Sequence, residues 1–331
     1  MKRKHPTKLQ SPPVRTTAWQ AILFLILLGL GGLQAQTPND ALMMPSRNTC
    51  VLLGYDMGSF DRYWEGAYLR HNETVATVDR NTVLPMAAIG ILDDLNFYLS
   101  LPYIDTESSE PNGGYFAGAR GFQDIGLALK YRVYKDTLGP GRLSLLTTAG
   151  FSTPLTNYLS DYKPYSIGAG APEFSLRGIA QYEFQSQFYV RGSLAYLWRG
   201  YTEAERDYYY NNGSYYTAWM DVPNAWNYEA VLGKWFFDTS LKLEVAYSAL
   251  HSTEGDDIRA YNAAQPTNKV EWDRIGFSAQ YFFKAVKGLG VVAYHNRIIN
   301  GRNVAKFSNT GFGLTYQFNY LQNKNDQANA N

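Results

Sequence analysis

Apolar and polar side chains alternate with a period of two over most of the chain. The clearest case is residues 311–320, where every second residue is apolar and the residues between are small or polar. Residues 124–134 and 188–199 follow the same rule, and no long segment after residue 35 has a helical period. Successive side chains of a β-strand point to opposite faces, so the pattern predicts an all-β chain.

Twelve segments of the chain carry this pattern, near 50–58, 80–91, 95–105, 121–134, 142–154, 171–184, 187–201, 224–237, 240–251, 268–283, 289–299 and 305–320. The connections alternate between short turns, such as 92–94 and 185–186, and mostly longer loops, such as 59–79 and 202–223. Bacterial outer-membrane barrels have even strand numbers, short periplasmic turns and longer external loops. We therefore predict a transmembrane up-and-down antiparallel β-barrel over residues 49–320, with both termini in the periplasm.

Such a sheet must close, because an unpaired backbone N–H or C=O in lipid costs several kcal/mol. Closure turns one face of every strand to hydrocarbon and the other to the lumen, so only half of each strand has to be apolar. This explains how a membrane protein can have a mean hydropathy of −0.32. Aromatic residues make up 15% of the chain and gather near the strand ends, as two interfacial girdles would require.

Residues 1–35 have the features of a secretory signal peptide. A basic head without acidic residues precedes an apolar run at 21–30 and a small-residue stretch that ends at Ala35. The alternative is an uncleaved anchor, but the apolar stretch is shorter than the roughly 20 residues of a spanning helix. Cleavage would leave a periplasmic N-terminal segment at 36–48, and residues 321–331 form a polar C-terminal tail. Export predicts an outer-membrane location, with the lipid bilayer, lipopolysaccharide and the barrel-assembly machinery as partners.

Charge and cysteine content exclude several classes of protein. Without residues 1–35 the chain would have 25 basic and 29 acidic residues, a net charge of −4, which does not suggest a nucleic-acid-binding face. Cys50 is the single cysteine, so the chain cannot form an internal disulfide or a cysteine-based zinc site. We predict no cofactor and no metal site, and a monomer is favoured.

The last strand resembles the assembly signal of outer-membrane barrels, in which a glycine is followed by two aromatic residues at a spacing of two. Gly313, Tyr316 and Phe318 match it, and the chain continues beyond them.

Two further segments resemble outer-membrane proteins associated with the meta-pathway of phenol degradation. In that family a G-x-x-D-x-L…LPY segment precedes a G-x-x-D-x-x-L-x-x-K-Y-R segment. Here residues 90–103 read GILDDLNFYLSLPY and residues 121–134 read GFQDIGLALKYRVY. The resemblance implies a barrel that passes small hydrophobic compounds, and it adds more to the fold than to the identity of the solute.

Strand parity places a set of charged side chains in the lumen. Its members are Asp56, Asp124, Lys130, Arg132, Arg177, Glu183, Arg191, Arg199, Glu229, Lys242, Glu244 and Arg274. One interpretation is a charged pore that sorts solutes. The other is a packed lumen in which opposite charges neutralise one another, because a barrel of this size can be filled by its own side chains.

One long loop is rich in aromatic residues and is predicted to lie at the external mouth. They are Tyr208, Tyr209, Tyr210, Tyr215, Tyr216 and Trp219. They could stack on an aromatic compound or a sugar, or the loops could pack on one another over the barrel.

Catalysis finds little support in the sequence. His251 and Ser252 are neighbours, which on a strand point to opposite faces, and the chain has no HExxH or GxSxG motif. We therefore predict a non-enzymatic barrel for passive passage of small, hydrophobic or aromatic solutes. The alternatives are a structural or interaction barrel with a closed lumen and an outer-membrane hydrolase.

Overall fold

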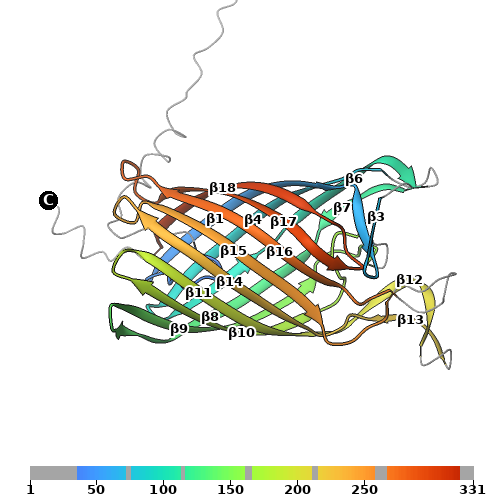
Figure 1. The fold of residues 1–331 in the computed structure, drawn as a ribbon, viewed down its shortest axis with the longest axis horizontal. Helices are drawn as coiled ribbons and strands as arrows, with labels where there is room; N and C mark the ends of the chain where they lie inside the picture. Colours follow the sequence, from blue (N-terminus) through green and yellow to red (C-terminus); the bar gives the residue numbers. More distant parts are fainter. Residues whose placement is uncertain are drawn as a thin grey trace, which may run out of the picture.

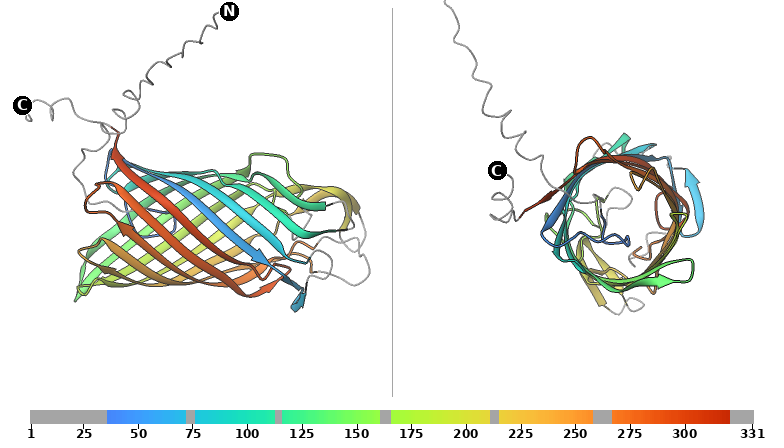
Figure 2. Two further views of the ribbon diagram at one scale, coloured as in Figure 1. Left: turned by 90° about the horizontal axis from the view of Figure 1, so that it is seen from above. Right: turned by 90° about the vertical axis from the view of Figure 1, so that its left-hand side faces the viewer.

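The computed structural model describes residues 36–71, 76–112, 116–160, 166–210, 215–257 and 267–320. Within these ranges the chain forms a cylinder of tilted antiparallel strands (Figures 1 and 2). The predicted signal peptide at 1–35 and the predicted tail at 321–331 lie outside the described residues. Among the described residues no helix is long and apolar enough to cross a membrane.

The barrel wall is one sheet of 14 strands. They are β1 (Asn48–Phe60), β4 (Val78–Leu92), β5 (Leu95–Ser100), β6 (Tyr103–Asn112), β7 (Phe116–Phe122), β8 (Asp124–Leu138), β9 (Gly141–Pro154), β10 (Glu173–Phe184), β11 (Phe188–Arg199), β14 (Ala225–Phe236), β15 (Leu241–Ser252), β16 (Glu271–Phe282), β17 (Leu289–Arg302) and β18 (Ser308–Asn319). β1 pairs with β4 on one side and with β18 on the other, which closes the cylinder.

The predicted number of twelve strands is confirmed, because two pairs of these 14 strands each form one continuous strand of the barrel wall. β5 continues into β6 across Leu101 and Pro102, and β7 continues into β8 across Gln123. Between the pairs Met86↔Ser100 and Val83↔Tyr103 the register places Pro85 opposite Leu101 and Pro102 opposite Leu84. A proline has no N–H to donate to the ladder, so the two prolines interrupt the wall at neighbouring levels. Counted in this way, the barrel wall has twelve strands.

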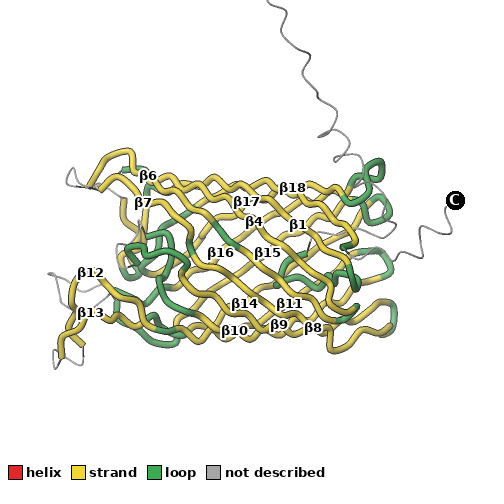
Figure 3. The backbone as a smooth tube through the Cα atoms, turned by 180° about the vertical axis from the view of Figure 1, so that it is seen from behind, coloured by secondary structure: helices red, strands yellow, loops and turns green. Residues whose placement is uncertain are grey.

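The alternation of short and long connections is also confirmed. β1 begins and β18 ends at the rim that carries the short turns, where Asn48 pairs with Asn319. At the opposite rim two long connections form hairpins of their own, which the sequence pattern does not predict. These are β2 (Arg62–Glu65) with β3 (Tyr68–His71; β3 is labelled in Figure 1), and β12 (Tyr201–Tyr210) with β13 (Tyr215–Asp221; Figure 3).

One strand starts later than the sequence predicts. β18 begins at Ser308 rather than near 305, because the preceding residues pair with β2 instead of the barrel wall. The amide of Trp64 donates to the carbonyl oxygen of Val304 at 2.8 Å, and the amide of Lys306 donates to that of Arg62 at 2.9 Å.

The two faces of the wall differ as the alternation requires. On β1, Leu53 and its outward neighbours are exposed, Leu53 by 58%, whereas the inward Cys50 and Asp56 are buried. The apolar side chains on the outside therefore have only hydrocarbon to pack against.

Residues 36–46 do not form a separate periplasmic segment but fold into the lumen near the short-turn rim (Figure 2, right, blue). Met44 is fully buried in a cluster with Cys50, Tyr98 and Trp235 of the inner wall. The carbonyl oxygen of Pro45 lies against Gly90 of β4, where an added Cβ would lie 2.0 Å from it. The wall thus accepts the segment only because residue 90 has no side chain.

We expect Gly90→Ala to displace this N-terminal segment without unfolding the barrel, because the clash is with the segment's backbone. Modification of the Cys50 thiol by a small thiosulfonate should become faster, since Cys50 is covered by Met44. Heat-dependent gel migration should persist as the sign of an intact barrel. Gly192→Ala is the matched control, since a Cβ there meets nothing within 4 Å. Equal labelling of both variants and the unaltered protein would contradict the expectation.

Candidate functional site

The structure places ten of the twelve predicted lumen residues on the inside of the wall. They are Asp56, Asp124, Lys130, Arg177, Arg191, Arg199, Glu229, Lys242, Glu244 and Arg274, each at a strand position whose immediate neighbours face outward. Arg132 and Glu183 lie at the short-turn rim instead. There the Arg132 Nε donates to Asp94 Oδ1 at 2.6 Å, and Arg142 Nη2 lies 3.0 Å from Glu183 Oε2. These two residues therefore lie at the rim and not within the lumen.

Glu244 is the centre of an ionic cluster on the inner wall. Its carboxylate accepts hydrogen bonds from the Tyr189 hydroxyl at 2.7 Å and from Arg191 Nη1 at 2.9 Å. Lys242 Nζ lies 3.4 Å from the same carboxylate, and Arg191 Nη2 lies 3.4 Å from Glu229. At this level the charges of β11, β14 and β15 neutralise one another, as a packed lumen would require. Arg191 Nε has no hydrogen-bond partner among the described residues.

Two guanidinium groups nearer the external end are bound differently. Arg177 donates to the Ser193 hydroxyl at 2.8 Å and to Asn227 Oδ1 at 2.6 Å. Arg274 donates to the Ser248 hydroxyl at 3.0 Å and lies over the Trp272 ring. No carboxylate of the described residues lies within ion-pair distance of either arginine. The lumen therefore keeps two fixed positive groups whose direct partners are neutral.

The neighbouring part of the wall is lined mostly by small side chains. Ser100, Gly126, Ala128, Gly150, Ser152 and Ser175 follow one another across β5, β8, β9 and β10 around a hollow of about 170 Å³. Pro38 of the N-terminal segment, Tyr98 and Glu173 also line it, together with the larger Met86, Leu127 and Phe151. The ionic cluster around Glu244 thus fills β11, β14 and β15, whereas the small residues of β5, β8, β9 and β10 leave an open hollow beside them.

Lys130 binds the N-terminal segment, a contact that the sequence pattern does not predict. Its side chain is 0% exposed, and its ammonium donates to Asp40 Oδ1 at 2.9 Å, to the Thr37 carbonyl oxygen at 2.8 Å and to the Asp40 carbonyl oxygen at 3.2 Å. Tyr98 lies beneath it, with the ring centroid 4.9 Å from Nζ. Residues 36–46 have no alternating pattern, so the sequence offers no signal that Asp40 reaches a strand 90 residues away.

The external end is narrowed by the connection between β9 and β10. The Tyr158 hydroxyl donates to Asp124 Oδ1 at 2.6 Å and accepts from the Gly170 amide at 3.0 Å. Burial and the hydrogen bond to Asp124 raise the pKa of the Tyr158 hydroxyl, which therefore stays protonated and able to donate. Arg80 of β4 donates to the carbonyl oxygen of the buried Ile167 at 3.2 Å. Arg80 is a lumen residue that the sequence analysis does not include.

The predicted mouth aromatics lie on the β12–β13 hairpin, which extends beyond the barrel wall (Figure 1). Tyr215, Tyr216 and Trp219 are all more than half exposed. The backbones of residues 208–210 pair with those of residues 215–217. The side chains of Tyr208, Tyr209 and Tyr210 lie outside the described part of the structure.

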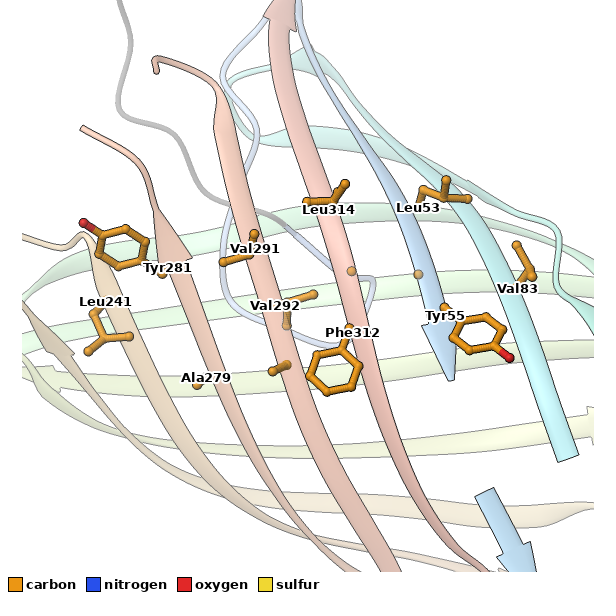
Figure 4. A pocket seen from close by; sticks show the side chains of 13 residues that line it. Leu53, Tyr55, Val83, Leu241, Ala279, Tyr281, Val291, Val292, Phe312 and Leu314 are labelled. Carbon is orange, nitrogen blue, oxygen red and sulfur yellow. The ribbon is translucent and has the colours of Figure 1, made fainter. Parts of the chain in front are cut away.

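The large apolar hollow shown in Figure 4 belongs to the outer wall, not to the lumen. It measures about 610 Å³, and outward residues such as Leu53, Phe312 and Leu314 line it. The cross-strand pair Ala279 and Ala293 makes it deep, because both side chains are small. In a membrane this surface faces lipid chains.

The residues of the predicted assembly signal all lie on β18, which closes the barrel against β1. The rings of Tyr316 and Phe318 stack on the outer wall with centroids 6.0 Å apart. Gly313 faces inward, where an added Cβ would lie 2.9 Å from Val292. A role in assembly stays a prediction.

Neither a metal centre nor a serine–histidine–carboxylate triad is formed by the residues that the structure describes. His295 Nε2 lies 3.4 Å from the Ser308 hydroxyl, but the other ring nitrogen contacts the Thr310 hydroxyl at 2.9 Å and not a carboxylate. No group of three or more His, Cys, Asp and Glu side chains comes together in those ranges. His251 lies on the outer wall, 3.0 Å from the Tyr228 hydroxyl and 3.3 Å from Asp273. The Ser252 hydroxyl instead donates to the carbonyl oxygen of Val270 at 2.8 Å.

Comparison with known proteins agrees with this architecture. An outer membrane channel from Pseudomonas putida F1 superimposes with a TM-score of 0.66 at 13% identity, over 86% of this chain and 100% of that one. The translocator domain of the autotransporter NalP from Neisseria meningitidis gives 0.44 at 13% identity, over 82% and 88%. The CymD monoaromatic hydrocarbon channel gives a TM-score of 0.40 at 10% identity, over 84% of this chain and 90% of that one. The last two TM-scores are below 0.5, so these two structures add nothing to the assignment of the fold.

No curated protein matches the sequence. A family model does, and it covers residues 70–328, from the β2–β3 hairpin past the end of the last strand. The resemblance seen in residues 90–103 and 121–134 is therefore confirmed over most of the chain. The protein is an outer-membrane β-barrel and belongs to the family described as "Putative MetA-pathway of phenol degradation".

Proposed function

We propose that the barrel is a passive path for small solutes across the outer membrane, including hydrophobic and aromatic ones. The observation that carries the proposal is the asymmetry of the lumen. Small residues from Ser100 to Ser175 line one wall around a hollow. Arg177 extends from β10 at the edge of that wall, and Arg274 extends from β16 on the opposite side of the cylinder. Such a lumen offers a solute both space and fixed polar groups. The family description, with its reference to phenol degradation, points to aromatic compounds.

Passage without chemistry fits this geometry better than hydrolysis does. His251 and Ser252 contact different partners, and Ser252 is bound to a backbone carbonyl. A hydrolase needs the two side chains to converge. We propose that the protein is not an enzyme and that it inserts as a monomer with the help of the barrel-assembly machinery. Lipopolysaccharide would surround its external half.

A barrel with a closed lumen is the second candidate, and specific contacts favour it. The N-terminal segment fills the lumen near the short-turn rim, and the β9–β10 connection narrows the external end through Tyr158 and Ile167. The ionic cluster around Glu244 fills part of the wall between them. The two candidates differ in whether solutes cross the purified protein.

Solute passage is tested with the purified barrel in planar bilayers and in liposomes. We expect discrete conductance steps in KCl and faster entry of sodium benzoate into protein-containing liposomes than into empty ones. Heat-unfolded protein is the control for leakage caused by detergent or by misfolded chains. Absence of both signals from a barrel that shows heat-dependent gel migration would favour the closed-lumen alternative.

The two arginines with neutral partners should set the ion preference. We expect Arg177→Gln combined with Arg274→Gln to lower the chloride-to-potassium permeability ratio about twofold or more, because fixed positive groups attract anions into a narrow lumen. The reversal potential in a KCl gradient measures this ratio. Lys234→Gln with Lys284→Gln is the matched control, since it removes two positive charges from the outer wall and a turn. An equal shift in both double variants would show that the arginines do not line the path.

A further inference from the structure

The ammonium group of Lys130 depends on the N-terminal segment for its hydrogen bonds. All three of its acceptors belong to Thr37 and Asp40. The barrel wall contributes only the face of the Tyr98 ring. A buried ammonium without an acceptor is costly. If the segment left the lumen, Lys130 would need another anion or water.

The segment is not part of the hydrogen-bonded wall. Its strand-like contact begins only near Arg47, whose amide donates to the carbonyl oxygen of Gly90. Further into the lumen it is held by side-chain contacts, such as the Thr148 hydroxyl donating to the Pro38 carbonyl oxygen at 2.9 Å. The Asp40 carboxylate also folds the segment locally, because it accepts from the amides of Thr37 and Leu42. Asp40 is thus a carboxylate presented to the wall by a separable element.

The charge balance of this part of the lumen rests on Asp40. Arg191 and Lys242 lie near enough to act electrostatically on Lys130. Glu244 and Glu229, which pair with Arg191, belong to the wall itself. With Asp40 in place three cations face three carboxylates, and without it one positive charge is left over. That surplus attracts an anion into the lumen.

Space for such an anion adjoins Lys130. Tyr98, which lies under the ammonium, also lines the hollow of about 170 Å³, and so does Pro38 of the segment. A solute in the hollow therefore lies beside the contact between Lys130 and Asp40. Its carboxylate could replace that of Asp40 without any rearrangement of the wall.

We propose that Lys130 is an anion-binding site of the lumen, that Asp40 masks it, and that small carboxylate solutes compete with Asp40 for it. The inference rests on the proposed function, since it names a solute class for the same lumen. A carboxylate solute that binds Lys130 releases the N-terminal segment, so its arrival opens the end of the path near the short turns. An uncharged solute of the same shape gains no such contact and leaves the segment in place.

Cys50 provides a native probe for this exchange. It is the single cysteine of the chain, and it is buried in the cluster that includes Met44 of the segment. We expect benzoate to accelerate modification of Cys50 by a small neutral thiosulfonate about tenfold, because a ligand shifts the population toward the state that binds it. Benzyl alcohol, the uncharged counterpart, should leave the rate unchanged. The measurement uses the full exported barrel in detergent.

Two substitutions at the site and one control substitution test the assignment. In Lys130→Met, Cys50 should react rapidly without any ligand, and benzoate should have no further effect. Lys234→Met is the matched control, because it removes an equal charge from the exposed face of β14, away from the lumen and the segment; it should keep the response to benzoate. In Asp40→Asn the benzoate concentration for half the effect should fall about tenfold, because the competing carboxylate is lost. Heat-dependent gel migration verifies each barrel.

Three results would overturn the proposal: no effect of benzoate on the unaltered protein, an equal effect of benzyl alcohol, or an undiminished effect in Lys130→Met. The outcome is separable from that of the passage experiment. Labelling that responds to benzoate in a barrel that conducts nothing would keep the site and reject passage. Conduction with labelling that ignores benzoate would keep passage and reject the site.

Discussion

The closed ladder of backbone hydrogen bonds is the constraint on which the rest of the structure depends. β1 pairs along nearly its whole length with both β4 and β18, so the wall has no free edge there. In hydrocarbon each unpaired N–H or C=O would cost several kcal/mol. At Pro85 and Pro102 the ladder lacks two backbone donors, yet the wall stays paired there. These levels are bridged by the amide of Leu101, which donates to the carbonyl oxygen of Pro85 at 3.1 Å.

Closure also decides where charge can go. Each strand has only two faces, and the outer one must be apolar, so the charged side chains of the strands are directed inward. Inside a narrow cylinder they meet one another. Glu244 accepts from Tyr189 and Arg191 because these groups sit on strands brought together by the ladder. The polar lumen is therefore a consequence of the membrane as much as of the solute.

The elements that close the lumen come from outside the ladder. The N-terminal segment and the β9–β10 connection fold into the two ends, where they supply carbonyl oxygens and a carboxylate to Lys130 and Arg80. Because these segments are not held by strand pairing, the hydrogen-bond ladder of the wall is complete without them. The path that we propose therefore needs movement of these segments but no rearrangement of the strands.

The sequence by itself determined the period-two strands, the alternation of turns and loops, and the side of the wall on which Lys130 or Arg191 lies. These features are local, because the faces of a strand follow from its own residues. Only the tertiary structure decided what those side chains meet. Asp40 lies 90 residues before Lys130 in a segment without periodicity, and Arg80 binds Ile167 of a distant loop. Such contacts depend on which segments the closed cylinder encloses, and no local pattern records that.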